Sequence, residues 1–181
     1  MKRIKNLLLF LLFLSVVLGV EPKISYNVLT LQQKVLLKKA YAYGDEFNMG
    51  YSMAAIMWQE SFVGKKVVPF NISDPSGGYW HKHLDYLLKE EDQPVNDLTR
   101  NLILVELITH MDYAASIAIK DLEKWKVMHG PTNWLAIWGS YNGGGVPNMS
   151  YAHQIDEKIQ VLKQIRDFKS KKTDDIPSIM P

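Results

Sequence analysis

The stretch from Ser52 to Glu60 constrains the fold most, because its residues from Met53 to Trp58 are all apolar. A helix with no polar face is stable only when other elements surround it, so this segment predicts a buried central helix. Glu60 then stands at or near the end of that helix, between Trp58 and Phe62. A carboxyl in such surroundings loses solvation when charged, so we expect a raised pKa and a role as general acid. A Glu60 that merely ends the helix and faces water is the alternative.

The N-terminus resembles an export signal. A basic start, Lys2 to Lys5, precedes an apolar stretch, Leu7 to Leu18, that is too short for a comfortable membrane span. We therefore predict a signal peptide over residues 1–19, cut after Gly19, and an exported protein of the periplasm or cell envelope. An uncleaved N-terminal anchor is the alternative, and it also places the rest of the chain outside the cytoplasm.

Charge and cysteine content narrow the function classes. Removing residues 1–19 takes away three of the 21 Lys and Arg and leaves 18 against 19 Asp and Glu. The resulting net charge of about −1 gives no support to a nucleic-acid partner. The chain has no cysteine, so packing must hold an exported domain together, and 47% apolar residues suffice for a core. We expect one domain over residues 20–168 and a loose tail over 169–181.

Helical periodicity covers most of the chain. Thr30 and Gln33 form a capping-box pattern that opens a helix running to Tyr43. Residues 64–80 hold glycine turns, prolines and valines, which favour a short β-hairpin or an irregular lobe. Further helices are expected over 97–119 and onward to the Gly130-Pro131 break, over 134–141 with Asn133 as its cap, and over 151–165. The predicted fold class is α+β, mainly α.

Three separated motifs carry the residues best suited to chemistry: Glu60-Ser61, Ser76-Gly77-Gly78-Tyr79-Trp80-His81 and Ser140-Tyr141-Asn142-Gly143-Gly144. They resemble, in order, the Glu-Ser, Ala-x-Gly-Leu-Met-Gln and Ala-Tyr-Asn-x-Gly motifs of the lysozyme-like lytic transglycosylase family. Tyr151 is similar to the tyrosine that opens the last helix of that family. The resemblance spans residues 30–165. It departs from the family at Pro75 and His81, where Gly and Gln are usual.

The resemblance implies a lysozyme-like fold with a small β or irregular lobe, and Glu60 as the only catalytic residue. In that family such a Glu protonates the oxygen between N-acetylmuramic acid and N-acetylglucosamine in the peptidoglycan glycan strand. As carboxylate it then takes the proton of the C6 hydroxyl, which closes a 1,6-anhydro ring without metal or cofactor. The implied substrate-binding residues are Ser61, Ser76, Gly78, Tyr79, Trp80, His81, Tyr141, Asn142 and Tyr151.

Several alternatives stay open at this point. Tyr141 and Tyr151 either orient Glu60 and the N-acetyl group or pack in the core. Asp74 would make the chain a hydrolytic lysozyme if it faces the cleft, although Asp74-Pro75 is also a turn sequence. A wall-binding module without turnover is the non-enzymatic alternative.

Two further expectations concern metals and partners. The run from His81 through His83 to Asp85 has alternating ligand types but no distant partner, so we expect surface histidines and no metal site. The small size suits an enzyme that opens the cell wall for a secretion system, pilus, flagellum or phage, which is an analogy at the level of the fold.

Overall fold

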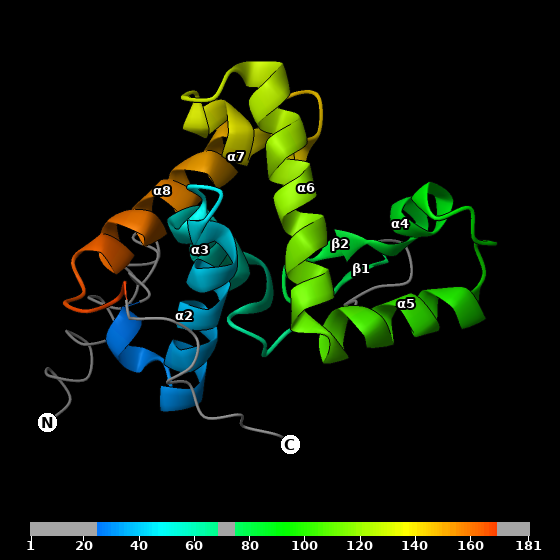
Figure 1. Ribbon diagram of the computed structural model, residues 1–181, viewed down its shortest axis with the longest axis horizontal. Helices are drawn as coiled ribbons and strands as arrows, with labels where there is room; N and C mark the ends of the chain where they lie inside the picture. The colour runs from blue at the N-terminus through cyan, green and yellow to red at the C-terminus, as the bar shows by residue number, and fades with distance from the viewer. Residues whose placement is uncertain (1–24, 69–74, 170–181) are drawn as a thin grey trace, which may run out of the picture.

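The computed structural model describes residues 25–68 and 75–169. The predicted signal peptide, Asp74 and nearly all of the predicted tail lie outside the described residues. Within them the chain forms helices throughout, with one small antiparallel sheet (Figure 1), which confirms a mainly α member of the α+β class. The elements are η1 (Tyr26–Val28), α2 (Leu31–Asp45), α3 (Gly50–Ser61), β1 (Ser76–Gly77), β2 (Lys82–His83), α4 (Leu84–Glu90), α5 (Asp97–Thr109), α6 (Met111–His129), α7 (Trp134–Gly143) and α8 (Met149–Lys163).

Helix α3 is the centre of the core, as the apolar stretch predicts. Every side chain from Met53 to Trp58 is at most 1% exposed, and α3 packs against α2, α6 and α8. The capping box at the start of α2 is also confirmed. The Thr30 hydroxyl accepts a hydrogen bond from the Gln33 backbone at 3.2 Å, and the Gln33 amide oxygen accepts one from the Thr30 backbone at 3.1 Å.

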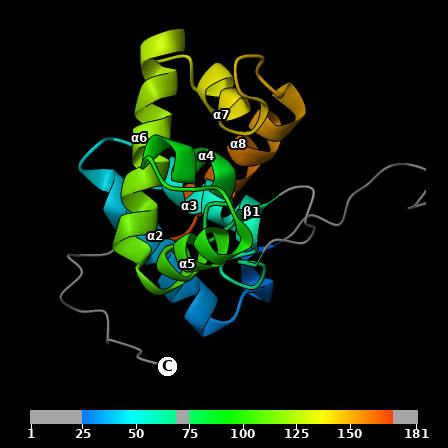
Figure 2. The ribbon, with the colours of Figure 1, turned by 90° about the vertical axis from the view of Figure 1, so that its right-hand side faces the viewer.

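The chain divides into two parts on either side of α6 (Figure 1). We call α2, α3, α7 and α8 the body, and β1, β2, α4 and α5 the lobe. Helix α6 contacts α2, α3 and α7 of the body and α5 of the lobe. Seen from the lobe side, α4 and β1 stand in front of α3, with α6 on one flank and α7 on the other (Figure 2). This arrangement brings elements of both parts around the end of α3.

The lobe differs in detail from the expectation for residues 64–80. Its strands begin later, at Ser76, and they pair with Ser76 opposite His83 and Gly77 opposite Lys82. Helix α4 follows directly and was not predicted.

The expected continuous helix from 97 to 119 is wrong, because the chain bends by 100° between α5 and α6. Its backbone leaves the helical region at His110, with φ −112° and ψ 84°.

Two smaller points concern helix ends and surfaces. Asn133 stands at the start of α7, but its side chain makes no capping hydrogen bond. On α5 the side chains Leu98, Leu102 and Val105 are exposed, and Ile103 and Leu107 are the ones that face the core.

Among the described residues no single helix has the length and hydropathy to cross a membrane, while α5 and α6 pass that test only as a bent pair.

Candidate active site

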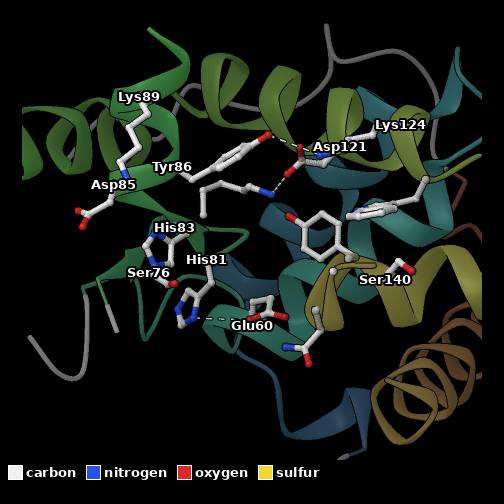
Figure 3. Close-up of a pocket in the computed structure, with 15 residues that line it drawn as sticks. Glu60, Ser76, His81, His83, Asp85, Tyr86, Lys89, Asp121, Lys124 and Ser140 are labelled. Atoms are coloured by element: carbon white, nitrogen blue, oxygen red, sulfur yellow. Dashed lines mark hydrogen bonds and ion pairs between the residues drawn. The ribbon is translucent and has the colours of Figure 1, made fainter. Parts of the chain in front are cut away.

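A cleft of about 720 Å³ lies where the lobe, α6 and α7 meet the end of α3 (Figure 3). Most of the residues that line it have polar or charged side chains, of both signs, and their apolar parts contribute about as much of the wall as their polar atoms. Seven stretches of chain contribute to it: Glu60 from α3, Ser76 from β1, His81 to His83 from the turn and β2, Asp85, Tyr86 and Lys89 from α4, Asp121, Lys124 and Trp125 from α6, Ser140 to Asn142 from α7, and Gly144 after it. The cleft therefore depends on the tertiary structure more than on any one segment.

Glu60 reaches this cleft because α3 ends abruptly just behind it. Phe62 adopts a left-handed conformation, with φ 49° and ψ 47°, and Val63 follows with φ 55°. Such angles are costly for residues with a Cβ, so surrounding contacts must hold them. The Gln33 amide donates to the Phe62 carbonyl at 2.9 Å and supplies one of these contacts. The Glu60 side chain is 14% exposed, which leaves it largely shielded from water but open to the cleft.

His81 stands beside Glu60 on the lobe side. Its Nε2 lies 2.5 Å from the Lys66 carbonyl oxygen, and its Nδ1 lies 3.6 Å from Glu60 Oε2. A carbonyl oxygen only accepts hydrogen bonds, so Nε2 must carry a proton and Nδ1 is the nitrogen left to face the carboxyl. His81 has φ 43°, a conformation that favours glycine. The strained backbone conformation therefore occurs at His81, the residue whose side chain faces Glu60.

Two tyrosines border Glu60 from the body. The Tyr141 hydroxyl donates to the Trp80 carbonyl at 3.0 Å. Burial raises the pKa of Tyr141 well above its usual value, and the charges of Asp121 and Glu60 raise it further. Burial likewise raises the pKa of Tyr151, with the neighbouring Glu60 charge as the second cause. Both phenols therefore stay protonated across the physiological range.

The Tyr151 hydroxyl is buried and makes no hydrogen bond of standard geometry among the described residues. It nevertheless lies close enough to the Glu60 side chain for a hydrogen bond between the two to contribute to its raised pKa. The Glu60 carboxyl is close enough for its charge to act on this hydroxyl. Tyr151 is thus available to donate to Glu60 or to a group bound beside it.

The floor of the cleft holds a shielded ion pair. Lys82 Nζ pairs with Asp121, and the two side chains are 10% and 21% exposed. The same ammonium lies 4.3 Å from the centre of the Tyr141 ring, a cation–π distance. This cluster ties β2, α6 and α7 together. It also occupies the Asp121 carboxylate, which would otherwise be a second acidic group available in the cleft.

Of the ten residues predicted for the site, five line the cleft: Glu60, Ser76, His81, Tyr141 and Asn142. Tyr151 lies behind it, near Glu60. The structure does not bring Ser61, Gly78, Tyr79 or Trp80 to the cleft wall. The motif patterns identify where these residues are in the chain but not which way their side chains point.

The four residues away from the wall have packing contacts instead. Ser61 is fully buried, donating to the Met57 carbonyl at 3.1 Å and accepting from the Gly64 backbone at 3.0 Å. Trp80 is 1% exposed and donates to the Met53 carbonyl at 2.9 Å. Tyr79 packs edge-on against Trp80, with ring centres 6.2 Å apart.

Gly78 fits the lobe tightly against α5. Its φ is +81°, and a Cβ placed there would come within 2.9 Å of the Leu107 Cβ. Its backbone N–H donates to the Val67 carbonyl at 2.7 Å. Glycine is therefore required here for both conformation and space, in a structural role rather than in contact with a ligand.

Sequence reasoning missed the contributions of α4 and α6. Asp121, Lys124 and Trp125 recur at helical spacing and so share one face of α6, which was a detectable pattern. Nothing local distinguishes such a face from an ordinary solvated one, however. Tyr86 and Lys89 of α4 were missed because that helix was not predicted.

No group of three or more potential metal ligands is gathered anywhere in residues 25–68 and 75–169. His83 and Asp85 both line the cleft, but Asp85 is held by Arg100 through two hydrogen bonds of 2.6 and 2.9 Å. This contact lowers the pKa of the Asp85 carboxyl.

Comparison of the chain with protein-family models, curated proteins and solved structures finds no match. The functional argument therefore depends on the site itself.

Proposed function

We propose that this protein is a peptidoglycan lytic transglycosylase with a lysozyme-like fold, in which Glu60 is the single catalytic acid and base. The observation that carries the proposal is the position of Glu60. It is a largely shielded carboxyl at the end of the central helix, it opens into the cleft of about 720 Å³, and His81 lies on one side of it. General acids in glycan cleavage are carboxyls in such surroundings.

The proposed reaction uses one carboxyl twice. Protonated Glu60 gives its proton to the glycosidic oxygen, and the bond from that oxygen to C1 of N-acetylmuramic acid breaks. The sugar's own C6 hydroxyl then bonds to C1, and the Glu60 carboxylate takes its proton. Glu60 ends as it began, and no water is consumed, unlike in the two-carboxylate glycosidases.

The charges in the cleft support a single-carboxyl reaction. The other carboxylates on the wall, Asp85 and Asp121, are each held by a cation, Arg100 and Lys82 respectively. A carboxylate held in this way is a poor base or nucleophile, because the neighbouring cation stabilises its charged form. Tyr141 and Tyr151 would orient Glu60 or the N-acetyl group, and Asn142, on the cleft wall, would offer an amide to the sugar.

The proposal also concerns location. Peptidoglycan lies outside the cytoplasm, so this function needs export to the periplasm or cell envelope, as the N-terminal pattern predicts. A role in opening the wall for a secretion, pilus or flagellar assembly, or for a phage, fits the same substrate.

Product mass tests the proposal directly. Purified protein would be incubated with peptidoglycan sacculi, and the released muropeptides weighed. A 1,6-anhydro end makes each product about 18 Da lighter than its hydrated counterpart, by one water. Glu60→Gln should release nothing. Glu157→Gln, an exposed glutamate on α8 outside the cleft wall, is the matched control and should behave as wild type.

The alternatives give different products. Full-mass reducing ends would indicate a hydrolytic lysozyme, and loss of activity in Asp74→Asn would then assign the second carboxylate. The transglycosylase proposal expects Asp74→Asn to keep most activity. Folded wild-type protein that binds glycan but releases no product would instead indicate a wall-binding module.

A further inference from the structure

The carboxylates of the cleft are already matched with partners. Each of the three that line the wall lies within ion-pair distance of a cationic or ionisable group: Glu60 with His81, Asp85 with Arg100, and Asp121 with Lys82. Asp85 is the most completely held, because Arg100 contacts both of its oxygens. The negative charge of the cleft is therefore largely balanced by the protein itself.

Two cleft lysines are not balanced in this way. Lys89 of α4 and Lys124 of α6 line the cleft, and neither forms an ion pair with a carboxylate among the described residues. Lys124 Nζ instead lies 3.5 Å from the neutral Tyr86 hydroxyl. By contrast, Lys120 and Lys126 on the same helix pair with Glu90 at 3.4 Å and Glu123 at 2.8 Å. The charge of Lys89 also acts on Asp85, but Arg100 already balances that carboxylate and Lys82 balances Asp121, so the α4–α6 end of the cleft has more positive than negative charge.

Flat aromatic surfaces flank this charge. Lys124 Nζ is 5.6 Å from the Tyr86 ring centre and 5.0 Å from that of Trp125, and both rings line the cleft. Tyr86 is 45% exposed, so its face is available for contact. Figure 3 shows Tyr86 and Lys124 reaching toward each other across the end of the cleft opposite Glu60. Aromatic side chains of this kind combine an apolar face with a polar edge, which suits a sugar ring.

We propose that Tyr86, Lys89, Lys124 and Trp125 form a subsite for a saccharide that bears a carboxylate. The inference rests on the proposed function, since it takes the ligand to be part of the same glycan strand whose bond lies at Glu60. Peptidoglycan supplies a carboxylate in two ways, through the lactyl group of N-acetylmuramic acid or through the stem peptide attached to it. A neutral N-acetylglucosamine polymer supplies none. The subsite thus selects muramyl glycans over neutral ones.

Binding measured without turnover tests this inference. Calorimetry would compare Glu60→Gln protein with three glycans of equal length: a neutral N-acetylglucosamine oligomer, a peptide-free strand with free lactyl carboxylates, and a peptide-bearing strand. We expect at least one carboxylate-bearing strand to bind more tightly than the neutral oligomer, and the preference to shrink as salt rises. A gain with the peptide-free strand identifies the lactyl carboxylate, and a gain confined to the peptide-bearing strand identifies the stem peptide.

Added substitutions locate the subsite. In the same background, Lys89→Gln with Lys124→Gln should abolish the preference, at about threefold in affinity per lysine. Lys126→Gln is the control, because Lys126 lies on α6, is paired with Glu123 and is not part of the cleft wall. Equal affinity for all three glycans, or a preference that survives the double substitution, would overturn the subsite.

The test separates the two proposals. Selective binding by Glu60→Gln protein, together with no product from wild type, would leave the subsite standing and remove the transglycosylase. Release of anhydro products without any preference for carboxylates would do the reverse. Failure to bind any of the three glycans would count against both.

Discussion

The imidazole of His81 lies between two oxygens, with Nε2 2.5 Å from the Lys66 carbonyl and Nδ1 3.6 Å from Glu60 Oε2. The first contact fixes the orientation and tautomer of the ring, so the second nitrogen is presented to the carboxyl. The distance to Glu60 is longer than a hydrogen bond, as is common at catalytic groups before substrate binds. His81 is thus placed as a positioning residue for Glu60.

This arrangement predicts how substitution changes the pH profile. In the tautomer that the Lys66 contact selects, the Nδ1 lone pair of His81 faces the Glu60 carboxyl and can accept from its acid form. His81→Ala removes that acceptor, so the alkaline limb of the kcat/KM profile should move to lower pH. His81→Gln keeps an acceptor oxygen at this position, so it should shift the alkaline side of the kcat/KM profile less than His81→Ala does. The other titratable groups around the cleft remain in both variants: Tyr141, Tyr151, Lys82, His83, Asp85, Tyr86, Lys89, Asp121 and Lys124.

An unchanged alkaline limb in His81→Ala, in protein that is folded by circular dichroism, would show that His81 does not act through Glu60. A rise in KM alone would instead make it a substrate contact.

Tyr151→Phe should separate stability from activity. The hydroxyl is buried, makes no hydrogen bond of standard geometry among the described residues and lies near the Glu60 carboxyl, so its removal should change the free energy of unfolding little. If the hydroxyl orients Glu60, activity should nevertheless fall by about tenfold or more. Urea unfolding and muropeptide release measure the two effects. Parallel loss of both would mean that the hydroxyl is structural.

The raised pKa values of Tyr141 and Tyr151 also predict a change in stability with pH. An unfolded tyrosine ionises near its model value of 10.0, whereas these two stay protonated above it when folded. The unfolded state therefore releases protons first, and folding stability should decline as pH rises through 10. Tyr151→Phe should make that decline shallower. Urea midpoints at mildly and strongly alkaline pH give the comparison, and an identical slope in wild type and variant would contradict it.

Gly78→Ala should destabilise the lobe. The substitution combines a positive φ with a close approach to Leu107, for a cost of about 2 to 4 kcal/mol. Gly130 is a useful comparison, since its φ is +85° but nothing lies within 4 Å of an added Cβ. Gly130→Ala therefore reports backbone strain alone and should cost less. Thermal unfolding measures both variants, and equal losses would show that the contact with Leu107 is unimportant.

Removing one member of the Lys82–Asp121 pair should destabilise the protein more than replacing both members with apolar residues. Asp121→Asn leaves a shielded lysine without its counter-charge, at a cost of about 1 to 3 kcal/mol, reduced by the 21% exposure of Asp121. Lys82→Met combined with Asp121→Leu removes both charges and should recover part of the loss. A double variant less stable than Asp121→Asn would contradict this account.

The sequence alone determined the centre of the fold. A run with no polar face cannot be stable in water, so the stretch ending at Glu60 had to become a buried helix, and α3 is that helix. The capping box at Thr30 and the helix break at Gly130 were equally readable, because caps and breaks depend on a few neighbouring residues. These features placed Glu60 at the end of the central helix.

Only the tertiary structure decided what surrounds Glu60. The pairing of Lys82 with Asp121 joins residues 39 positions apart, and it exists because α6 packs between body and lobe. Periodicity encodes which side of a helix is buried, not which distant element meets it. For the same reason Ser61 and Trp80, adjacent in sequence to cleft residues, turn into the core. The orientation of the His81 side chain depends on a positive φ and on the contact with the Lys66 carbonyl, which no local pattern predicts.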